Sequence, residues 1–237
     1  MEKKGCLYEG KAKRIYETEK PEVLWVEYKD DATAFNGEKK ETLLGKGRLN
    51  NEISSLIFST LAKQGVKSHF IERLSETEQL IRRVTIIPIE VVVRNVAAGS
   101  LVKRLGFTRG ETFHKPIVEL YYKDDELGDP LMNEEHIQAL QLATPDEIQT
   151  MKEKALAVNE QLIELFKRID VQLIDFKLEF GRDTSGNVLL ADEISPDTCR
   201  LWDIKTGESF DKDLFRFQQG NLQEGYETIF NRLGGQA

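Results

Sequence analysis

Charged and apolar side chains alternate in the stretch Leu173–Gly181, and this pattern could position charges for chemistry. Successive side chains of a β-strand point to opposite faces, so the apolar residues of this stretch share one face. Asp175, Lys177 and Glu179 share the other face. Such a face is either solvated or directed at a ligand, and carboxylates are the side chains that Mg²⁺ prefers.

A second carboxylate could meet Glu179 across a hairpin. The turn RDTSGN separates the first run from VLLADE, which carries Asp192. A hairpin symmetric about Ser185 and Gly186 places Glu179 opposite Asp192, where like charges destabilise the pair by up to about 1 kcal/mol. A shared Mg²⁺ reverses that effect, and the nearby Lys177 favours a polyanionic ligand. Two solvated carboxylates, or a register shifted by one residue, would explain the same pattern.

A candidate anion site follows the run IIPIEVVV, which predicts a strand with Glu90 and Arg94 on one face. The strand is expected to break at AAG, after which Ser100 would cap a short helix over residues 101–105. Free backbone N–H groups at a helix start suit a phosphate, and the Ser100 hydroxyl and Arg94 guanidinium would complete the site. An ordinary strand–turn–helix with Arg94 in a surface ion pair is the alternative.

The segment SPDTCRLWD lies just beyond the hairpin and supplies Asp197 and Arg200. Arg200 taken alone fits an ion pair, but beside a metal site it is a candidate for a second phosphate contact. Trp202 is expected in the core. Cys199 is expected to be a small buried residue rather than a nucleophile, because no histidine lies near it in the sequence.

A basic turn near the N-terminus, in LYEGKAKRIYE, is a weaker candidate. Gly10 would allow a tight turn flanked by Lys11 and Lys13. Backbone N–H groups and two lysines can cover the phosphates of a nucleotide. The turn lacks the Walker A and G-x-G-x-x-G patterns, and a hairpin with exposed lysines is the commoner explanation.

The elements that must position these residues can be predicted from periodicity. The N-terminal part predicts mainly strands, with a clear one over residues 23–28. RLNNEISSLIFSTLAKQG predicts a helix that ends at Gly65, and SHFIERL and EQLIRRV predict two further strands. A boundary near residues 82–88 is expected to separate a smaller lobe, residues 1–84, from a larger one, residues 85–237.

The larger lobe contains the strongest helix signal of the chain. Thr144 is a predicted N-cap, with Pro145 in the first turn and Glu147 three residues after the cap. An apolar stripe follows at helical spacing and indicates core packing. It comprises Ile148, Met151, Ala155, Val158, Leu162, Leu165 and Ile169. A C-terminal helix is expected from about Asp213 to Leu233, which gives an α+β fold.

Composition narrows the functional classes. The 237 residues are 40% apolar and 31% charged, with a net charge of −8. This balance disfavours general binding to nucleic acid or to anionic membranes, since both need a basic face. Two cysteines without paired spacing, no signal-peptide core and no apolar run near the roughly 20 residues of a membrane span predict a cytoplasmic protein.

Three segments together resemble SAICAR synthetases of the bacterial type. They are LYEGKAKRIYET, IIPIEVVVRNVAAGSLVKRLG, and LIDFKLEFG with LADEISPDTCRLWD, and the intervening segments are similar as well. The resemblance implies a two-lobed fold like that of ATP-grasp enzymes and protein kinases. It also implies an ATP-dependent ligase of de novo purine synthesis that joins L-aspartate to carboxyaminoimidazole ribonucleotide (CAIR), forming ADP and phosphate. A homodimer is implied too.

The same resemblance implies a role for each candidate residue. Residues Gly10, Lys11, Ala12 and Lys13 would cover the ATP phosphates, with Lys123 as a further ATP contact, and Glu179 and Asp192 would hold Mg²⁺. Arg94, Ser100 and Arg200 would bind the ribonucleotide phosphate, and Glu90, Lys177 and Asp197 would surround the imidazole and its carboxylate. Asp129 and Asp175 are additional candidates. The L-aspartate site stays open, with the basic segments GEKK and LGKG as contributors or as solvated loops.

This inventory suits the implied chemistry. A carboxylate is a poor acyl donor, so phosphorylation by ATP would give an acyl phosphate that an amine can attack. Such transfer depends on positioning and charge neutralisation, and it needs no activated serine or cysteine. Two other classes would use similar residues: a small-molecule kinase that stops at the phosphorylated product, and a non-catalytic nucleotide-binding module.

Overall fold

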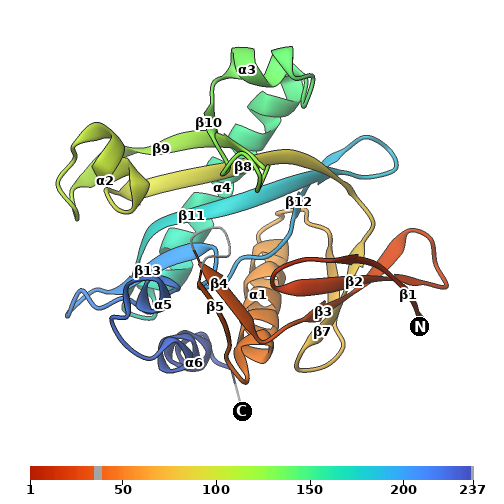
Figure 1. Ribbon diagram of the computed structural model, residues 1–237, viewed down its shortest axis with the longest axis horizontal. Coiled ribbons are helices and arrows are strands. Elements are labelled where there is room, and N and C mark those ends of the chain that lie inside the picture. Colours follow the sequence, from red (N-terminus) through yellow and green to blue (C-terminus); the bar gives the residue numbers. More distant parts are fainter. Residues whose placement is uncertain (35–38, 236–237) are drawn as a thin grey trace.

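Two antiparallel sheets organise the chain in the computed structural model, which describes residues 1–34 and 39–235 (Figure 1). The first sheet has the order β1-β2-β3-β7-β6. Its strands are β1 (Lys3–Glu9), β2 (Lys13–Thr18), β3 (Val23–Tyr28), β7 (Glu78–Arg82) and β6 (Phe70–Arg73). A small ribbon of β4 (Asp31–Ala34) and β5 (Lys39–Thr42) follows it. All the strands predicted in this part of the chain are present.

The second sheet carries most of the predicted site residues. Its order is β10-β9-β8-β11-β12, and a further strand, β13, also pairs with β11. The strands are β8 (Thr85–Val96), β9 (Thr112–Tyr122), β10 (Leu131–Met132), β11 (Val171–Arg182), β12 (Val188–Ala191) and β13 (Cys199–Asp203). β8 and β11 form the long central pair, so a side chain on either strand has neighbours on both sides.

Six helices accompany the sheets within the described residues. They are α1 (Lys46–Lys63), α2 (Ser100–Leu105), α3 (Glu134–Ala139), α4 (Pro145–Lys167), α5 (Asp213–Phe217) and α6 (Leu222–Arg232). α4 packs against β8 and β11, and α1 packs against α6 (Figure 1). None of the helices in this part of the chain combines the length and apolarity that crossing a membrane requires.

The capping prediction for α4 is confirmed. Thr144 accepts a hydrogen bond from Glu147 N, and the Glu147 carboxylate accepts one from Thr144 N. The stripe from Ile148 to Leu162 is buried against the sheet, and each fully buried Leu or Ile contributes roughly 1.5–3 kcal/mol relative to an exposed one. The helix ends at Lys167, so Ile169 lies beyond it, partly buried.

One hydrophobic cluster runs through α1, α4, α6, β8 and β11. Leu49, Ile53 and Ile57 of α1 belong to it although α1 lies within residues 1–84. The cluster therefore links the two predicted lobes, and their division at residues 84/85 remains a prediction.

Three predicted elements differ from the structure. The C-terminal helix is two helices, α5 and α6, because Gln218 and Gly220 adopt positive φ angles that interrupt it. α2 starts at Ser100 itself, and the N-cap is Gly99, so Ser100 does not cap the helix. The acidic loop contains β10 and α3. Gly37 and Glu38 of the GEKK segment lie outside the described residues.

Candidate active site

A cavity of about 770 Å³ lies between the first sheet and the β8–β11 pair. Every predicted site residue except Ser100 lines it: Gly10, Lys11, Ala12, Lys13, Glu90, Arg94, Lys123, Asp129, Asp175, Lys177, Glu179, Asp192, Asp197 and Arg200. Ser100 lies beside the cavity, where its Oγ accepts a hydrogen bond from Arg94 Nη2 at 3.4 Å. The alternating face of β11 is therefore directed at a shared space and not at bulk solvent.

The hairpin register differs by one residue from the symmetric prediction. Glu179 pairs with Ala191, not with Asp192. The Asp183 carboxylate accepts hydrogen bonds from Ser185 N and Asn187 N, and these bonds support a longer turn than the prediction assumed. β12 then ends at Ala191, and Asp192 adopts a left-handed φ of 60°, a conformation that costs a non-glycine residue roughly 1–3 kcal/mol.

The cross-strand neighbour of Glu179 on its other side is also acidic. Glu179 pairs with Glu90 of β8, directly before a bulge that contains Pro88. Lys177 Nζ bridges the two carboxylates, at 2.7 Å from Glu90 and 2.9 Å from Glu179. Lys123 Nζ also donates to Glu179, at 2.6 Å. The like-charge repulsion is therefore offset by two lysines in the structure.

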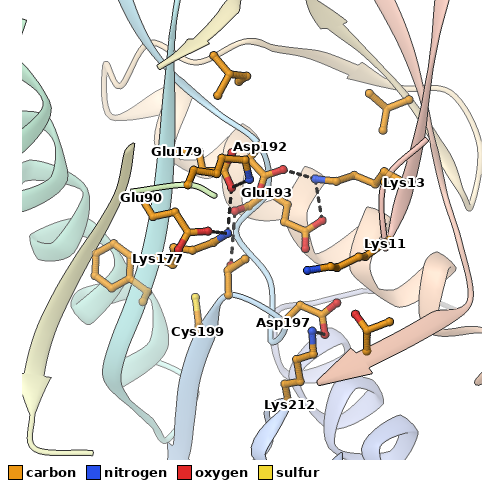
Figure 2. A pocket seen from close by; sticks show the side chains of 18 of the residues that line it. Lys11, Lys13, Glu90, Lys177, Glu179, Asp192, Glu193, Asp197, Cys199 and Lys212 are labelled. Carbon is orange, nitrogen blue, oxygen red and sulfur yellow. Dashed lines mark hydrogen bonds and ion pairs between the residues drawn. The ribbon is translucent and has the colours of Figure 1, made fainter. Parts of the chain in front are cut away.

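Asp192 is held ionised by the lysines of this end of the cavity. Burial opposes ionisation, but the charges of Lys13, Lys177 and Lys123 hold the pKa of the Asp192 carboxyl well below its usual range. Lys13 reaches from β2 and donates a hydrogen bond to Asp192 (Figure 2). The pKa of the Lys13 ammonium is raised well above its usual value, since Asp192 and Glu193 outweigh the effect of burial.

Glu193 belongs to this cluster and is the main residue that the sequence prediction missed. Its Oε2 atom lies 3.1 Å from Lys13 Nζ but accepts no hydrogen bond within the described residues. Burial raises the pKa of the Glu193 carboxyl, and the Asp192 charge adds to that increase although Lys13 opposes it. Glu193 directly follows Asp192 in LADE, and this adjacency to a predicted site residue could have marked it as a candidate.

The carboxylates at the lysine-rich end of the cavity suit Mg²⁺, which needs few protein ligands, better than a metal ion coordinated entirely by protein side chains. Within residues 1–34 and 39–235, no group of three or more His, Cys, Asp or Glu side chains is arranged to hold a metal ion. Glu179 and Asp192 both line the cavity, and Lys123 and Lys177 act electrostatically on both. Mg²⁺ typically takes one or two carboxylates and completes its shell with waters and phosphate oxygens. The unsatisfied Glu193 oxygen is a further acceptor beside that pair.

The other polar end of the cavity is built from arginines. Arg94 donates to Glu119 at 2.6 Å through Nε and to Asp175 at 2.8 Å through Nη1. Its side chain is 5% exposed, and that of Asp175 is 5% exposed. Arg94 therefore lies in a buried network, and the alternative of a surface ion pair is wrong.

Arg200 approaches the same carboxylate from β13. Its Nη1 donates to both oxygens of Asp175, at 3.0 and 3.1 Å, and its Nε donates to Asp213 at 2.8 Å. Gly99 lies against the guanidinium, where an added Cβ would be 2.6 Å from Nη2. Only glycine fits there, because its φ of 57° also falls in the left-handed region.

Asp197 lies between the two ends, and both oxygens of its carboxylate accept hydrogen bonds. Its carboxylate accepts hydrogen bonds from Lys46 Nζ at 2.5 Å, Asn50 Nδ2 at 2.8 Å and Tyr226 Oη at 2.5 Å. Burial opposes ionisation, but Lys212 and Lys46 lower the pKa of Asp197 far below its usual range. Lys46 of the LGKG segment is therefore a buried member of this cluster, whereas Leu44 of the same segment is 78% exposed.

The N-terminal turn closes the cavity from the first sheet. Gly10 N donates to Lys13 O at 2.8 Å, which forms the predicted tight turn. Gly10 does not adopt a positive φ. Glycine is favoured here because a Cβ at this position would lie 3.0 Å from the Tyr8 ring. Lys11 Nζ reaches across to Asp125 at 2.6 Å, so the turn contacts the acidic loop on the far side.

Between these charged parts, one wall of the cavity is apolar. Ile15, Leu24, Val26, Ile81 and Ile86 line it from the first sheet and the start of β8. Cys199 also lines the cavity and is buried, as predicted, and burial raises the pKa of its thiol, which disfavours the reactive thiolate. An apolar wall beside lysines and carboxylates suits a molecule with a flat ring and a charged tail.

Comparison with known proteins agrees with this geometry. The family model described as SAICAR synthetase matches residues 6–233. A phosphoribosylaminoimidazole-succinocarboxamide synthase from Shouchella clausii is 67% identical over 99% of this chain and 98% of the relative. The chain belongs to the SAICAR synthetase family.

Solved structures of SAICAR synthetases share the whole fold. The enzyme from Ehrlichia chaffeensis superposes with a TM-score of 0.95 at 47% identity, covering 98% of this chain and 100% of the other. A SAICAR synthetase in complex with ADP superposes with a TM-score of 0.94 at 49% identity, covering 97% of each chain. These likenesses confirm the predicted α+β, ATP-grasp-like fold.

Membership in the SAICAR synthetase family confirms the predicted activity class, an ATP-dependent ligase of purine biosynthesis. The small-molecule kinase is not favoured. Sequence reasoning also missed Arg216, which lines the cavity. It missed Glu119, Lys212, Asp213 and Tyr226 as well, whose partners lie far away in the chain. No local motif marks them, because their partners are brought close only by the fold.

Proposed function

We propose that this chain joins L-aspartate to the carboxylate of CAIR at the cavity between the two sheets, with ATP as phosphoryl donor and Mg²⁺ bound at Glu179 and Asp192. The observation that carries the proposal is the arrangement of one cavity with a lysine–carboxylate end, an arginine end and an apolar wall. These three environments match a metal-bound triphosphate, a ribonucleotide phosphate and a purine base. Further proposals are a homodimer and a cytoplasmic location.

The nucleotide is assigned to the first-sheet side of the cavity. The apolar wall of β2, β3 and β7 would take the adenine, and residues 10–13 would cover the phosphates. Lys11 of that turn donates a hydrogen bond to Asp125, and Lys123 donates one to Glu179. Mg²⁺ bound by Glu179 and Asp192 would neutralise phosphate charge, which is the largest electrostatic barrier in phosphoryl transfer.

The ribonucleotide is assigned to the second-sheet side. Arg94 and Arg200 converge on Asp175, beside Ser100 and Gly99. The three guanidinium nitrogens of Arg94 already donate within the protein, whereas Arg200 Nη2 makes no hydrogen bond within the described residues. A phosphate is well matched by two planar guanidinium groups. Glu90, Lys177 and Asp197 lie between this end and the metal carboxylates, where the imidazole ring and its carboxylate would bind.

The chemistry follows from bringing these groups together. The γ-phosphoryl group of ATP passes to an oxygen of the CAIR carboxylate, which releases ADP and forms an acyl phosphate. The amine of L-aspartate then attacks the carbonyl carbon, and phosphate leaves with that oxygen. The lysines lower the repulsion between the carboxylate and the triphosphate, and the two sheets limit access of water to the acyl phosphate.

Dependence on both acceptors tests the proposal. ADP release is measured with ATP and Mg²⁺ alone, with CAIR added, with L-aspartate added, and with both. We expect steady turnover only with both, and SAICAR as the product by mass spectrometry. Steady ADP release with CAIR in the absence of L-aspartate, with a stable phosphorylated product, would support the kinase and contradict the ligase. A metal titration with Mg²⁺ and EDTA checks the cofactor separately.

A further inference from the structure

Among the described residues, one lysine of the cavity has no close carboxylate partner. Lys212, directly before α5, points toward Asp197 (Figure 2), but its Nζ atom stays 4.0 Å from the nearest carboxylate oxygen of that part of the chain. Asp197 already accepts hydrogen bonds from Lys46, Asn50 and Tyr226. The Lys212 side chain is only 16% exposed. An ammonium group in this position has lost much of its hydration without gaining a strong hydrogen bond in return.

The charges around Lys212 leave this position short of negative charge. Burial lowers the pKa of Lys212, Asp197 offsets only part of that effect, and the like charges of Lys46 and Arg216 lower it further. Burying an under-paired cation is unfavourable, and such groups are concentrated at sites that bind a ligand of opposite charge. An added anion would relieve the repulsion among these three cations.

The fold holds Lys212 firmly in place. Its backbone N donates to Pro196 O at 3.0 Å, and the preceding Asp211 accepts hydrogen bonds from Leu201 N and Asp213 N at 2.8 Å each. Gly225 of α6 lets this segment approach closely, since an added Cβ would lie 2.7 Å from Leu214 Cδ1. The lysine is therefore built into a rigid turn and is not a solvated side chain that happens to face the cavity.

Arg216 supplies a second cation one helical turn later. It lines the same cavity, and its Nη1 donates to Asp213 at 2.7 Å. Its Nε and Nη2 atoms make no hydrogen bond within the part of the chain that the structure describes. Asp213 also accepts from Arg200, so this carboxylate separates Arg216 from the Arg94–Arg200 pair. The cationic wall is thus divided into two neighbouring anion subsites.

We propose that Lys212 and Arg216 bind a carboxylate of the incoming L-aspartate. This assignment rests on the proposed function, which places the ribonucleotide phosphate at Arg94 and Arg200 and leaves the second subsite for the amino acid. Lys212 adjoins Asp197, which lies five residues beyond Asp192 on a segment lining the cavity. A carboxylate held there would keep the amine on the side of the cavity where the activated carbonyl forms.

Steady-state kinetics of Lys212→Ala and Arg216→Ala test this proposal. We expect the KM for L-aspartate to rise roughly ten- to hundredfold in each variant, as expected for loss of a charge-assisted hydrogen bond. The KM values for ATP and CAIR should stay within about twofold. The preference for L-aspartate over L-asparagine as amine donor should fall in the variants, and Lys212→Arg should restore part of it.

A matched control separates binding from general effects. Lys205→Ala removes an exposed lysine, paired with Asp170 outside the cavity, and should leave every KM unchanged. A rise in the KM for CAIR instead of L-aspartate, or no change in any KM, overturns the subsite while the function stands. If Lys212→Ala does not fold, Arg216→Ala decides by the same criteria. A wild-type enzyme that turns over without L-aspartate overturns both the function and the subsite.

Discussion

The two charged ends of the cavity are both proposed to bind phosphate-bearing ligands, but they are built from different side chains. At the lysine end, the proposed metal site, Lys13, Lys123 and Lys177 contact Glu179 and Asp192. At the other end, Arg94 and Arg200 share Asp175 and are anchored by Glu119 and Asp213. Lys123 is 42% exposed and Lys177 is 27% exposed, whereas Arg94 is 5% exposed.

This difference in side chains and exposure indicates that the two ends have different roles in ligand binding. A lysine ammonium is a point charge on a flexible chain, so it can exchange a carboxylate for a phosphate oxygen or yield to a metal ion. An arginine fork keeps its geometry while it gains one more partner. The lysine end is therefore suited to a ligand that changes charge during the reaction, and the arginine end to a ligand group that only anchors.

Asp192→Asn should have the largest effect, because it removes one of the two carboxylates proposed to hold Mg²⁺ at the lysine end. We expect kcat to fall by about a thousandfold, in line with the loss of a main electrostatic contact to the transition state. ADP release at saturating substrates measures the change. Asp146→Asn, an exposed acid in the first turn of α4, is the control. A variant that keeps near-normal kcat would remove Asp192 from the metal site.

Arg94→Ala and Lys177→Ala compare the two ends in stability. Removing Arg94 leaves buried carboxylates without their main partner and should lower the free energy of unfolding by about 3–5 kcal/mol. Removing the partly exposed Lys177 should cost roughly 1 kcal/mol, because Lys123 still pairs with Glu179. Urea unfolding at neutral pH measures both. Equal losses would break the contrast between a rigid and an exchangeable end.

Arg200→Lys sharpens the same contrast in ligand binding. The substitution keeps the charge but loses the planar fork that contacts Asp175 and Asp213. We expect the KM for CAIR to rise about tenfold while the KM for ATP is unchanged. A comparable rise in the KM for ATP would mean that Arg200 belongs to the nucleotide's side of the cavity.

The ion pair between Arg182 and Glu147 lies away from both ends of the cavity, and its removal should have the smallest effect of these variants. Hydrogen bonds from Arg182 lower the pKa of Glu147 to about 2, against burial, and the Thr144 N–H adds to the shift. The pair therefore stabilises the fold fully above pH 4.5, and this contribution is lost as the pH falls toward 2.

Glu147→Gln should reduce the free energy of unfolding by about 1 kcal/mol at pH 7, and by progressively less below pH 4.5. Urea titrations at several pH values measure it, with Glu160→Gln on the same helix as control. A difference that stays constant across pH would show that the charge of Glu147 does not contribute.

Local patterns in the sequence were sufficient for much of the fold. Thr144, Pro145 and Glu147 specify the start of α4 through contacts within four residues. The alternation in β11 predicted which side chains share a face. What it did not predict is that both faces are buried: Asp175 and Glu179 are each 3% exposed. Burial of a polar face depends on the first sheet, whose position no local pattern encodes.

The register of the β11–β12 hairpin, which differs from the prediction by one residue, also could not be predicted from local sequence patterns. Turn residues indicated a hairpin, but its register depends on how the Asp183 carboxylate bonds within the turn. The predicted neighbour of Glu179 was therefore wrong, although both carboxylates line the cavity. Asp192 enters it through a left-handed backbone conformation that is uncommon for residues other than glycine and hard to foresee from sequence. The site residues were found by residue type and resemblance, and their contacts required the fold.

The end of β12 is joined to the first sheet as well as to β11. Ser68 forms an isolated parallel bridge with Leu190, where His69 N donates to Leu190 O at 2.8 Å. Leu190 lies two residues before Asp192. A tilt of the first sheet must either break this bridge or pull the Asp192 carboxylate along with it. The bridge thus couples the position of the sheet proposed to face the nucleotide to the position of a carboxylate proposed to bind the metal.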